Sequence, residues 1–116
     1  FDTIFNNLIS NSIYAVKSKR TTQNRKILIK GNLQEDNIII VVSDTGKGLD
    51  EEYRNNPSVI FNAFESSRCN KNGEKIGTGL GLYITKATVN EYKNSSIQIL
   101  PQLEGFGIKI TFKNLI

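Results

Sequence analysis

Apolar residues in the first part of the chain recur with a helical period. Over residues 2 to about 19 they fall on one face at roughly 100° per residue, and polar side chains line one flank of that face. Asn is a poor helix former. The side chains of this flank are therefore either simply exposed to solvent or directed at a group other than water. The apolar residues are Phe1, Ile4, Phe5, Leu8, Ile9, Ala15 and Val16, and the flank is formed by Asn7, Asn11, Tyr14 and Ser18.

The next segment has the composition of two β-strands joined by a turn. Residues 25–31 and 37–43 are predicted as strands joined by a turn around residues 32–36. The run from Ile38 to Val42 is continuously apolar and β-branched. This composition predicts a central strand that helices cover on at least one face.

A carboxylate and two spaced glycines follow that strand directly, at Asp44, Gly46 and Gly48. A carboxylate at the end of a buried strand is a fixed hydrogen-bond acceptor. Glycines beside it let the backbone pass close to a flat ligand. The same Asp-Thr-Gly sequence also occurs in plain turns, so this motif alone leaves both interpretations open.

The second half of the chain consists of short apolar elements, and one polar, aperiodic loop at residues 65–76 interrupts them. A loop of that length inside a compact domain is usually functional, so we expect a lid that is mobile without ligand. The other expected elements are a short acidic helical turn at 49–55 ended by Pro57, an apolar return to the core at 58–64, a helix from 78 to about 92, and strands at 95–100 and 107–113.

This order of elements predicts an α+β fold, a two-layer α/β sandwich. Helices should cover one face of a mixed, largely antiparallel sheet. Neither glycine cluster follows a strand into a crossover helix, which argues against a doubly wound fold. A length of 116 residues fits a single domain over residues 1–116.

The segment from Lys75 to Val89 places three glycines at every second position before an apolar helical pattern. Gly77, Gly79 and Gly81 leave room for a ligand, and the first amides of a helix bind anions together with its dipole. The pattern indicates a phosphate site, with plain turns as the alternative, and it matches neither the dinucleotide fingerprint nor the Walker loop. The residues expected to be buried on this helix are Leu80, Leu82, Ile84, Ala87 and Val89.

Composition narrows the setting of the domain. At 38% hydrophobic and 22% charged residues, the chain is an ordinary soluble globular one. It contains no apolar run of the roughly eighteen residues that a membrane span needs, and no leader. A single Cys69 excludes an internal disulfide and indicates a reducing, cytoplasmic compartment. The absence of Met and the start at Phe1 indicate a piece of a longer protein, whose own membrane anchorage stays open.

Positive charge is concentrated in one segment. The net charge is +4. Such a segment could contact nucleic acid or anionic lipid, but no aromatic residues interleave the charges, which favours a solvated loop and strand edge without a nucleic-acid partner. The residues are Lys17, Lys19, Arg20, Arg25, Lys26 and Lys30.

Four motifs together resemble the nucleotide-binding family of gyrase, the ninety-class heat-shock chaperones, MutL and sensor histidine kinases, known as the GHKL family, whose fold is the Bergerat fold. The resemblance covers almost the whole chain, and four motifs in the right order and spacing are a strong signal. Asn7–Ala15 resembles the N box, Asp44–Gly48 the first glycine box, Ile60–Phe64 the F box, and Gly77–Leu82 the second glycine box.

The resemblance implies a role for each motif in binding Mg²⁺-ATP. Asn11 would offer its amide oxygen to Mg²⁺, which prefers hard oxygen ligands. Asp44 would accept the adenine 6-amino hydrogen, and Gly46 and Gly48 would let the backbone approach the base.

The resemblance also implies a phosphate site and a catalytic cation. Arg68 would neutralise charge on the γ-phosphate during transfer. The amides of Gly79, Leu80 and Gly81 would hold the phosphates, and Asn7, Ile60, Phe64, Gly77 and Thr78 would complete the nucleotide site.

Position 7 separates the subfamilies. Members that hydrolyse ATP carry a Glu one turn before the metal-binding Asn, where it activates a water or a hydroxyl, whereas this chain has Asn7. The resemblance is therefore closest to the catalytic domain of a sensor histidine kinase. The chain contains no His. The phosphorylated His would lie on a dimerisation domain of the same protein, which implies a homodimeric parent and a downstream response regulator.

The chain departs from the family pattern at two positions, and these departures leave alternative functions open. Tyr14 stands where many sensor kinases have a Lys, and Ile108 replaces a Thr often found in the last strand. A degenerate module that binds nucleotide weakly and signals by contact, a pseudokinase, is one alternative. A GHKL-type ATPase acting as a clamp on nucleic acid is the other, disfavoured by Asn7 and by the lack of a transducer sequence after Ile116.

Overall fold

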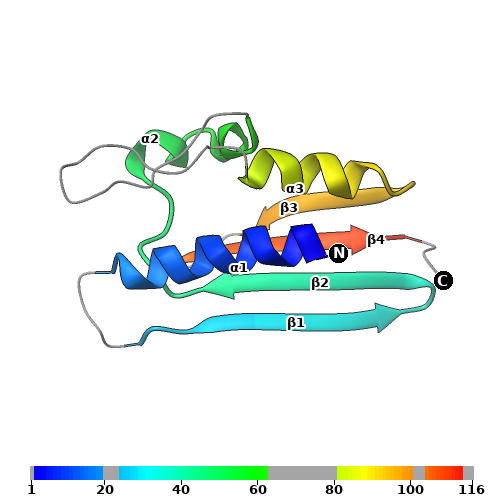
Figure 1. The fold of residues 1–116 in the computed structure, drawn as a ribbon, viewed down its shortest axis with the longest axis horizontal. Helices are drawn as coiled ribbons and strands as arrows, with labels where there is room; N and C mark the ends of the chain where they lie inside the picture. The colour runs from blue at the N-terminus through cyan, green and yellow to red at the C-terminus, as the bar shows by residue number, and fades with distance from the viewer. Residues whose placement is uncertain (1, 20–23, 63–80, 101–103, 114–116) are drawn as a thin grey trace.

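A computed structural model describes residues 2–19, 24–62, 81–100 and 104–113 of the chain (Figure 1). Its elements follow the predicted order of helices and strands. They are α1 (Asp2–Lys17), β1 (Ile27–Gln34), β2 (Asn37–Asp44), α2 (Glu51–Arg54), the 3-10 helix η1 (Pro57–Phe61), α3 (Gly81–Asn90), β3 (Ser95–Leu100) and β4 (Phe106–Phe112).

The strands form one sheet in the order β1-β2-β4-β3, with every neighbouring pair antiparallel. Helix α1 packs against β2, α3 packs against β3, and the two helices contact each other. Figure 1 shows the two long helices on the same side of the sheet. This arrangement confirms the predicted two-layer α/β sandwich, with a sheet that is wholly antiparallel in the described part of the chain.

Strand β2 lies inside the sheet, as its β-branched run predicts. Ile40, Val42 and Asp44 are buried at alternate positions, because successive side chains of a strand point to opposite faces. Ile40 lies opposite Ile110 of β4, and Val42 lies opposite Ile108. The buried apolar core consists of Ile4, Leu8, Ile40, Val42, Tyr53, Ile60, Phe61, Val89, Ile108, Ile110 and Phe112.

Two details of the predicted elements are wrong. Strand β1 runs from residue 27 to 34 instead of 25 to 31, because the connection to β2 is a tight turn at residues 35–36, with Glu35 at a φ of 56°. The buried face of α3 also differs from the prediction. Thr85 and Val89, one turn apart, are fully buried, whereas Ile84 and Ala87 are exposed. Leu82 and Ile84 are two residues apart, and residues at that spacing do not share a helix face.

Gly105, in the connection between β3 and β4, holds the backbone at the end of β2. It has a φ of +81°, and a Cβ added to it would lie 1.9 Å from the carbonyl oxygen of Asp44. Only glycine combines this left-handed conformation with so close an approach. The backbone around Asp44 is therefore fixed from the β4 side.

We predict that Gly105→Ala lowers the free energy of unfolding by about 2 to 5 kcal/mol, because it adds backbone strain and a steric clash. Urea unfolding followed by circular dichroism measures this loss. Gly31→Ala is the matched control. No atom lies within 4 Å of a Cβ added at Gly31, so that change should stay within about 1 kcal/mol of the parent. Equal losses in the two variants would show that Gly105 has no special role.

Candidate functional site

The carboxylate of Asp44 is buried at the end of β2, with 5% of the residue exposed. Its Oδ1 accepts the Gly46 N–H at 2.8 Å. The Ser12 hydroxyl and the Phe106 N–H donate to it as well. Burial raises the pKa of Asp44 above its ordinary value, and these three hydrogen bonds lower it only in part. The site thus holds a carboxylate whose charge depends on the donors around it.

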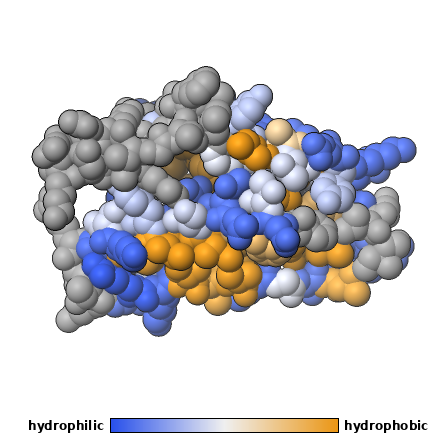
Figure 2. Space-filling view, in the orientation of Figure 1, coloured by the Kyte–Doolittle hydropathy of each residue, from blue (hydrophilic) through white to orange (hydrophobic). Residues whose placement is uncertain are grey.

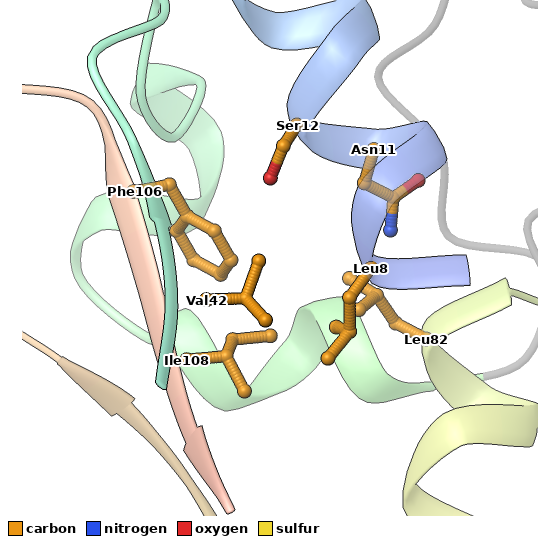
Figure 3. A pocket seen from close by; sticks show the side chains of 7 residues that line it. All are labelled: Leu8, Asn11, Ser12, Val42, Leu82, Phe106 and Ile108. Atoms are coloured by element: carbon orange, nitrogen blue, oxygen red, sulfur yellow. The ribbon is translucent and has the colours of Figure 1, made fainter. Parts of the chain in front are cut away.

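A small pocket lies between α1, the sheet and the start of α3 (Figure 3), and Asp44 does not line it directly. Two residues that line it, Ser12 and Phe106, are donors to Asp44. The water-sized space inside is about 10 Å³, which is roughly the room for one water molecule. The lining residues are Leu8, Asn11, Ser12, Val42, Leu82, Phe106 and Ile108.

The turn after Asp44 is docked tightly on α1. A Cβ added at Gly46 would lie 2.5 Å from the backbone carbon of Ala15, and the Lys47 N–H donates to the Ala15 carbonyl at 3.2 Å. Gly48 has a φ of +76° and packs against Gly105. Both glycines of this motif are therefore required by the backbone path.

Asn7 and Asn11 face different parts of the site, although both lie on α1 and both are half-buried. Asn11 lines the pocket beside Asp44. A Cβ added at Gly81, the first residue of α3, would lie 3.8 Å from the Asn7 side-chain oxygen. The polar flank of α1 is thus directed at the pocket and at the start of α3, which is the second of the two interpretations of its composition.

The described structure places a cation near the far end of this flank. The Lys47 ammonium lies 5.2 Å from the centre of the Tyr14 ring and 3.5 Å from Asp50 Oδ1. Its position over the ring is that of a cation–π contact. Tyr14 is therefore half-buried beneath a positive charge that belongs to the first glycine motif.

The remaining predicted site residues fall into two groups, one described and one outside the described residues. Ile60 is buried in the apolar core and does not line the pocket. The predicted lid at 65–76 lies outside the described residues, as do the site residues Phe64, Arg68, Gly77, Thr78, Gly79 and Leu80.

Sequence reasoning missed Ser12 and Phe106 as donors to Asp44. Ser12 continues the buried stripe of Ile4 and Leu8 at intervals of four residues. A small polar residue on an apolar stripe is a signal that could have found it. Phe106 gives no such signal, because it acts through its backbone and reaches Asp44 only through the register of β2 and β4.

Two kinds of feature are absent from the described ranges. No group of three or more His, Cys, Asp or Glu side chains is arranged there to hold a metal ion. None of the helices within those ranges is long and apolar enough to cross a membrane.

Comparison with known proteins gives a consistent result. A model of the family described as "Histidine kinase-, DNA gyrase B-, and HSP90-like ATPase" matches residues 1–115. The chain is 34% identical over 90 residues to the phytochrome-like protein Cph1 of Synechocystis sp., which is 78% of this chain and 11% of that protein. It is 31% identical over 94 residues to the sensor protein SrrB of Staphylococcus aureus, which is 81% of this chain and 15% of that protein.

Solved structures share the fold. The mycobacterial sensor histidine kinase MprB superimposes with a TM-score of 0.66 at 21% identity, covering 95% of this chain and 67% of that one. The catalytic domain of the histidine kinase ThkA gives a TM-score of 0.66 at 22% identity, covering 94% and 62%. The family resemblance predicted from the four motifs is thereby confirmed. The chain belongs to the family of histidine kinase-, DNA gyrase B- and HSP90-like ATPases and is an ATP-binding domain of the histidine kinase type.

Proposed function

We propose that this domain binds Mg²⁺-ATP, with adenine at Asp44, and donates the γ-phosphate to a His on a separate dimerisation domain of the same protein. The observation that carries the proposal is the buried carboxylate of Asp44, which accepts hydrogen bonds from Ser12 and Phe106, two residues that line the pocket. A carboxylate has about four acceptor sites on its two oxygens, so Asp44 can accept a further hydrogen bond beside the three from Gly46, Ser12 and Phe106. The 6-amino group of adenine is a donor, whereas guanine presents an acceptor at the same position.

The amide of Asn11 is suited to a Mg²⁺ ion held mostly by phosphates and water. Its oxygen is a hard ligand in the pocket lining, and Mg²⁺ is usually bound through one or two protein oxygens plus substrate phosphates. The ion would neutralise charge on the phosphates. We place the phosphates on the side of the pocket where Asn7 of α1 lies near Gly81, the first residue of α3.

Asn7 determines which nucleophile can react. An amide side chain cannot accept a proton, so this position offers no general base for water. The acceptor domain would supply the nucleophile instead. An imidazole nitrogen would attack the γ-phosphorus, the bond from that phosphorus to the bridging oxygen would break, and ADP would leave. Arg68 stays the proposed cation for this step.

The partners follow from this chemistry. This chain contains no His, so the acceptor is a separate domain, and a response regulator would take the phosphate from it. SrrB is a sensor protein by name, which supports a sensor protein as the parent, and we propose that this parent is a homodimeric kinase. We place the domain in the cytoplasm, where ATP and the response regulator would be available.

We predict that Asp44→Asn weakens ATP binding about tenfold to a hundredfold, since a hydrogen bond to a charged group is worth about 1.5 to 3 kcal/mol. If the Asn oxygen keeps the Gly46 N–H, its NH₂ group faces the adenine amino group as a second donor. Titration calorimetry with ATP measures the loss. Asp36→Asn, which makes the same charge change at the exposed β1–β2 turn, should leave the affinity unchanged. Equal affinity of the parent for ATP and GTP would contradict the adenine site.

The same variant should be at least as stable as the parent at neutral pH. The pKa of Asp44 is raised in the folded state, so the folded protein binds the proton more tightly than the unfolded chain. The stability contributed by this group therefore falls as pH rises from its ordinary pKa of 3.8 through the raised value. Urea unfolding at several pH values should show the advantage of Asp44→Asn shrinking as pH falls below this window.

We predict that the domain transfers radiolabelled phosphate to the parent's His-containing domain and releases almost none into solution. Asn11→Ala should abolish Mg²⁺-dependent binding and transfer. Asn7→Glu should raise hydrolysis, because general-base assistance is worth about 10² to 10⁴ in rate. Asn6→Ala, an exposed neighbour on α1, serves as the control.

The outcome also separates the alternatives. Rapid phosphate release by the unmodified domain without an acceptor would return it to the hydrolase branch of the family. ATP binding without transfer to the acceptor would identify a pseudokinase.

A further inference from the structure

Ser12 is the one polar residue among the buried positions of α1. It lies on the same stripe as Ile4 and Leu8, and 5% of it is exposed. Figure 3 shows its hydroxyl oxygen directed away from the helix, toward the side of the pocket that holds Phe106. A buried hydroxyl is costly unless it is hydrogen-bonded, and this one donates to Asp44.

Three donors from three elements hold the Asp44 carboxylate. The Gly46 and Phe106 donors are backbone amides of the turn after β2 and of β4. The Ser12 donor is a side chain of α1. A substitution at position 12 can therefore remove this donor. The two backbone donors persist whatever residue is present, except proline.

The Ser12 hydrogen bond favours the ionised form of Asp44, which offers adenine the better acceptor. Burial favours the protonated acid, and hydrogen bonds from donors favour the carboxylate. Protonation would turn one of the two acceptor oxygens of Asp44 into an O–H donor and leave only the carbonyl oxygen as an acceptor for the adenine 6-amino group. The charged form is also the stronger acceptor.

We propose that Ser12 is a positioning residue for nucleotide recognition, which keeps Asp44 ionised and oriented as the acceptor for the 6-amino group of adenine. This inference rests on the function proposed above. It assigns base selectivity to a pair of residues, one on α1 and one on β2, and Ser12 need not touch the base to act.

The test compares ATP with purine riboside triphosphate, which is ATP without its 6-amino group, in the parent and in Ser12→Ala. Calorimetry should show that Ser12→Ala weakens ATP on the order of tenfold but changes the affinity for purine riboside triphosphate by less than about twofold. Equal weakening of both nucleotides would show a purely structural role. No weakening of either would also overturn the proposal.

Two further variants control for packing. Ser12→Cys nearly keeps the volume of the side chain but donates only weakly, so it should resemble Ser12→Ala in base selectivity while folding like the parent. Ser95→Ala removes a half-buried hydroxyl that donates to the Tyr92 carbonyl at 2.7 Å, and Ser95 does not line the pocket. It should affect stability and leave the ATP affinity unchanged.

A measurement without nucleotide separates this proposal from the function on which it rests. Carbon-13 NMR of the Asp44 carboxyl should show its titration midpoint moving to higher pH in Ser12→Ala, because a hydrogen bond that lowers the pKa is lost. An unchanged midpoint would contradict the proposed role of Ser12 whatever the domain binds. If the parent does not discriminate between the two nucleotides, the adenine site itself fails, even where the midpoint moves.

Discussion

The burial of one carboxylate sets the conditions for the rest of this structure. Asp44 is ionisable and almost fully enclosed, so its environment has to supply donors from several directions. Those donors come from α1, from the turn after β2, and from β4. The helix therefore has to lie over the sheet at one position, and β4 has to pair with β2 in one register. Apolar packing alone would tolerate small shifts of α1 along the sheet, whereas the hydrogen bond between Ser12 and Asp44 does not.

The sequence predicted the elements well where a single period dominates. The β-branched run of β2 was placed inside the sheet, and the helical period of α1 gave its length to within two residues. The face of α3 was predicted only in part: Val89 is buried as expected, but Ile84 and Ala87 are exposed, because the residues chosen around the glycine motif do not share one helical face. At the site, Asp44 and Asn11 could be found from the motifs. The Phe106 donor could not, because it depends on how two strands align.

The glycines of the first motif are explained by contacts, and not by turn chemistry alone. The backbone of Ala15 occupies the space that any side chain at Gly46 would need. Position 14, where the family resemblance leads one to expect a lysine, has a tyrosine, and Lys47 of the same motif lies over its ring. The C-terminal half of α1 and the motif after β2 thus contact each other at two places, Gly46 against Ala15 and Lys47 over Tyr14.

The narrowness of the pocket has a consequence for affinity. A space of about 10 Å³ is far below the roughly 300 Å³ of the smallest usual ligand sites, so a purine ring bound there as proposed would have to displace side chains such as Leu82 and Phe106. Binding would then draw on the fraction of molecules in which these side chains stand apart. The apparent dissociation constant would equal the intrinsic one divided by that fraction. Two domains with the same polar contacts to the base can therefore differ widely in affinity, through nothing more than the ease with which their apolar walls separate.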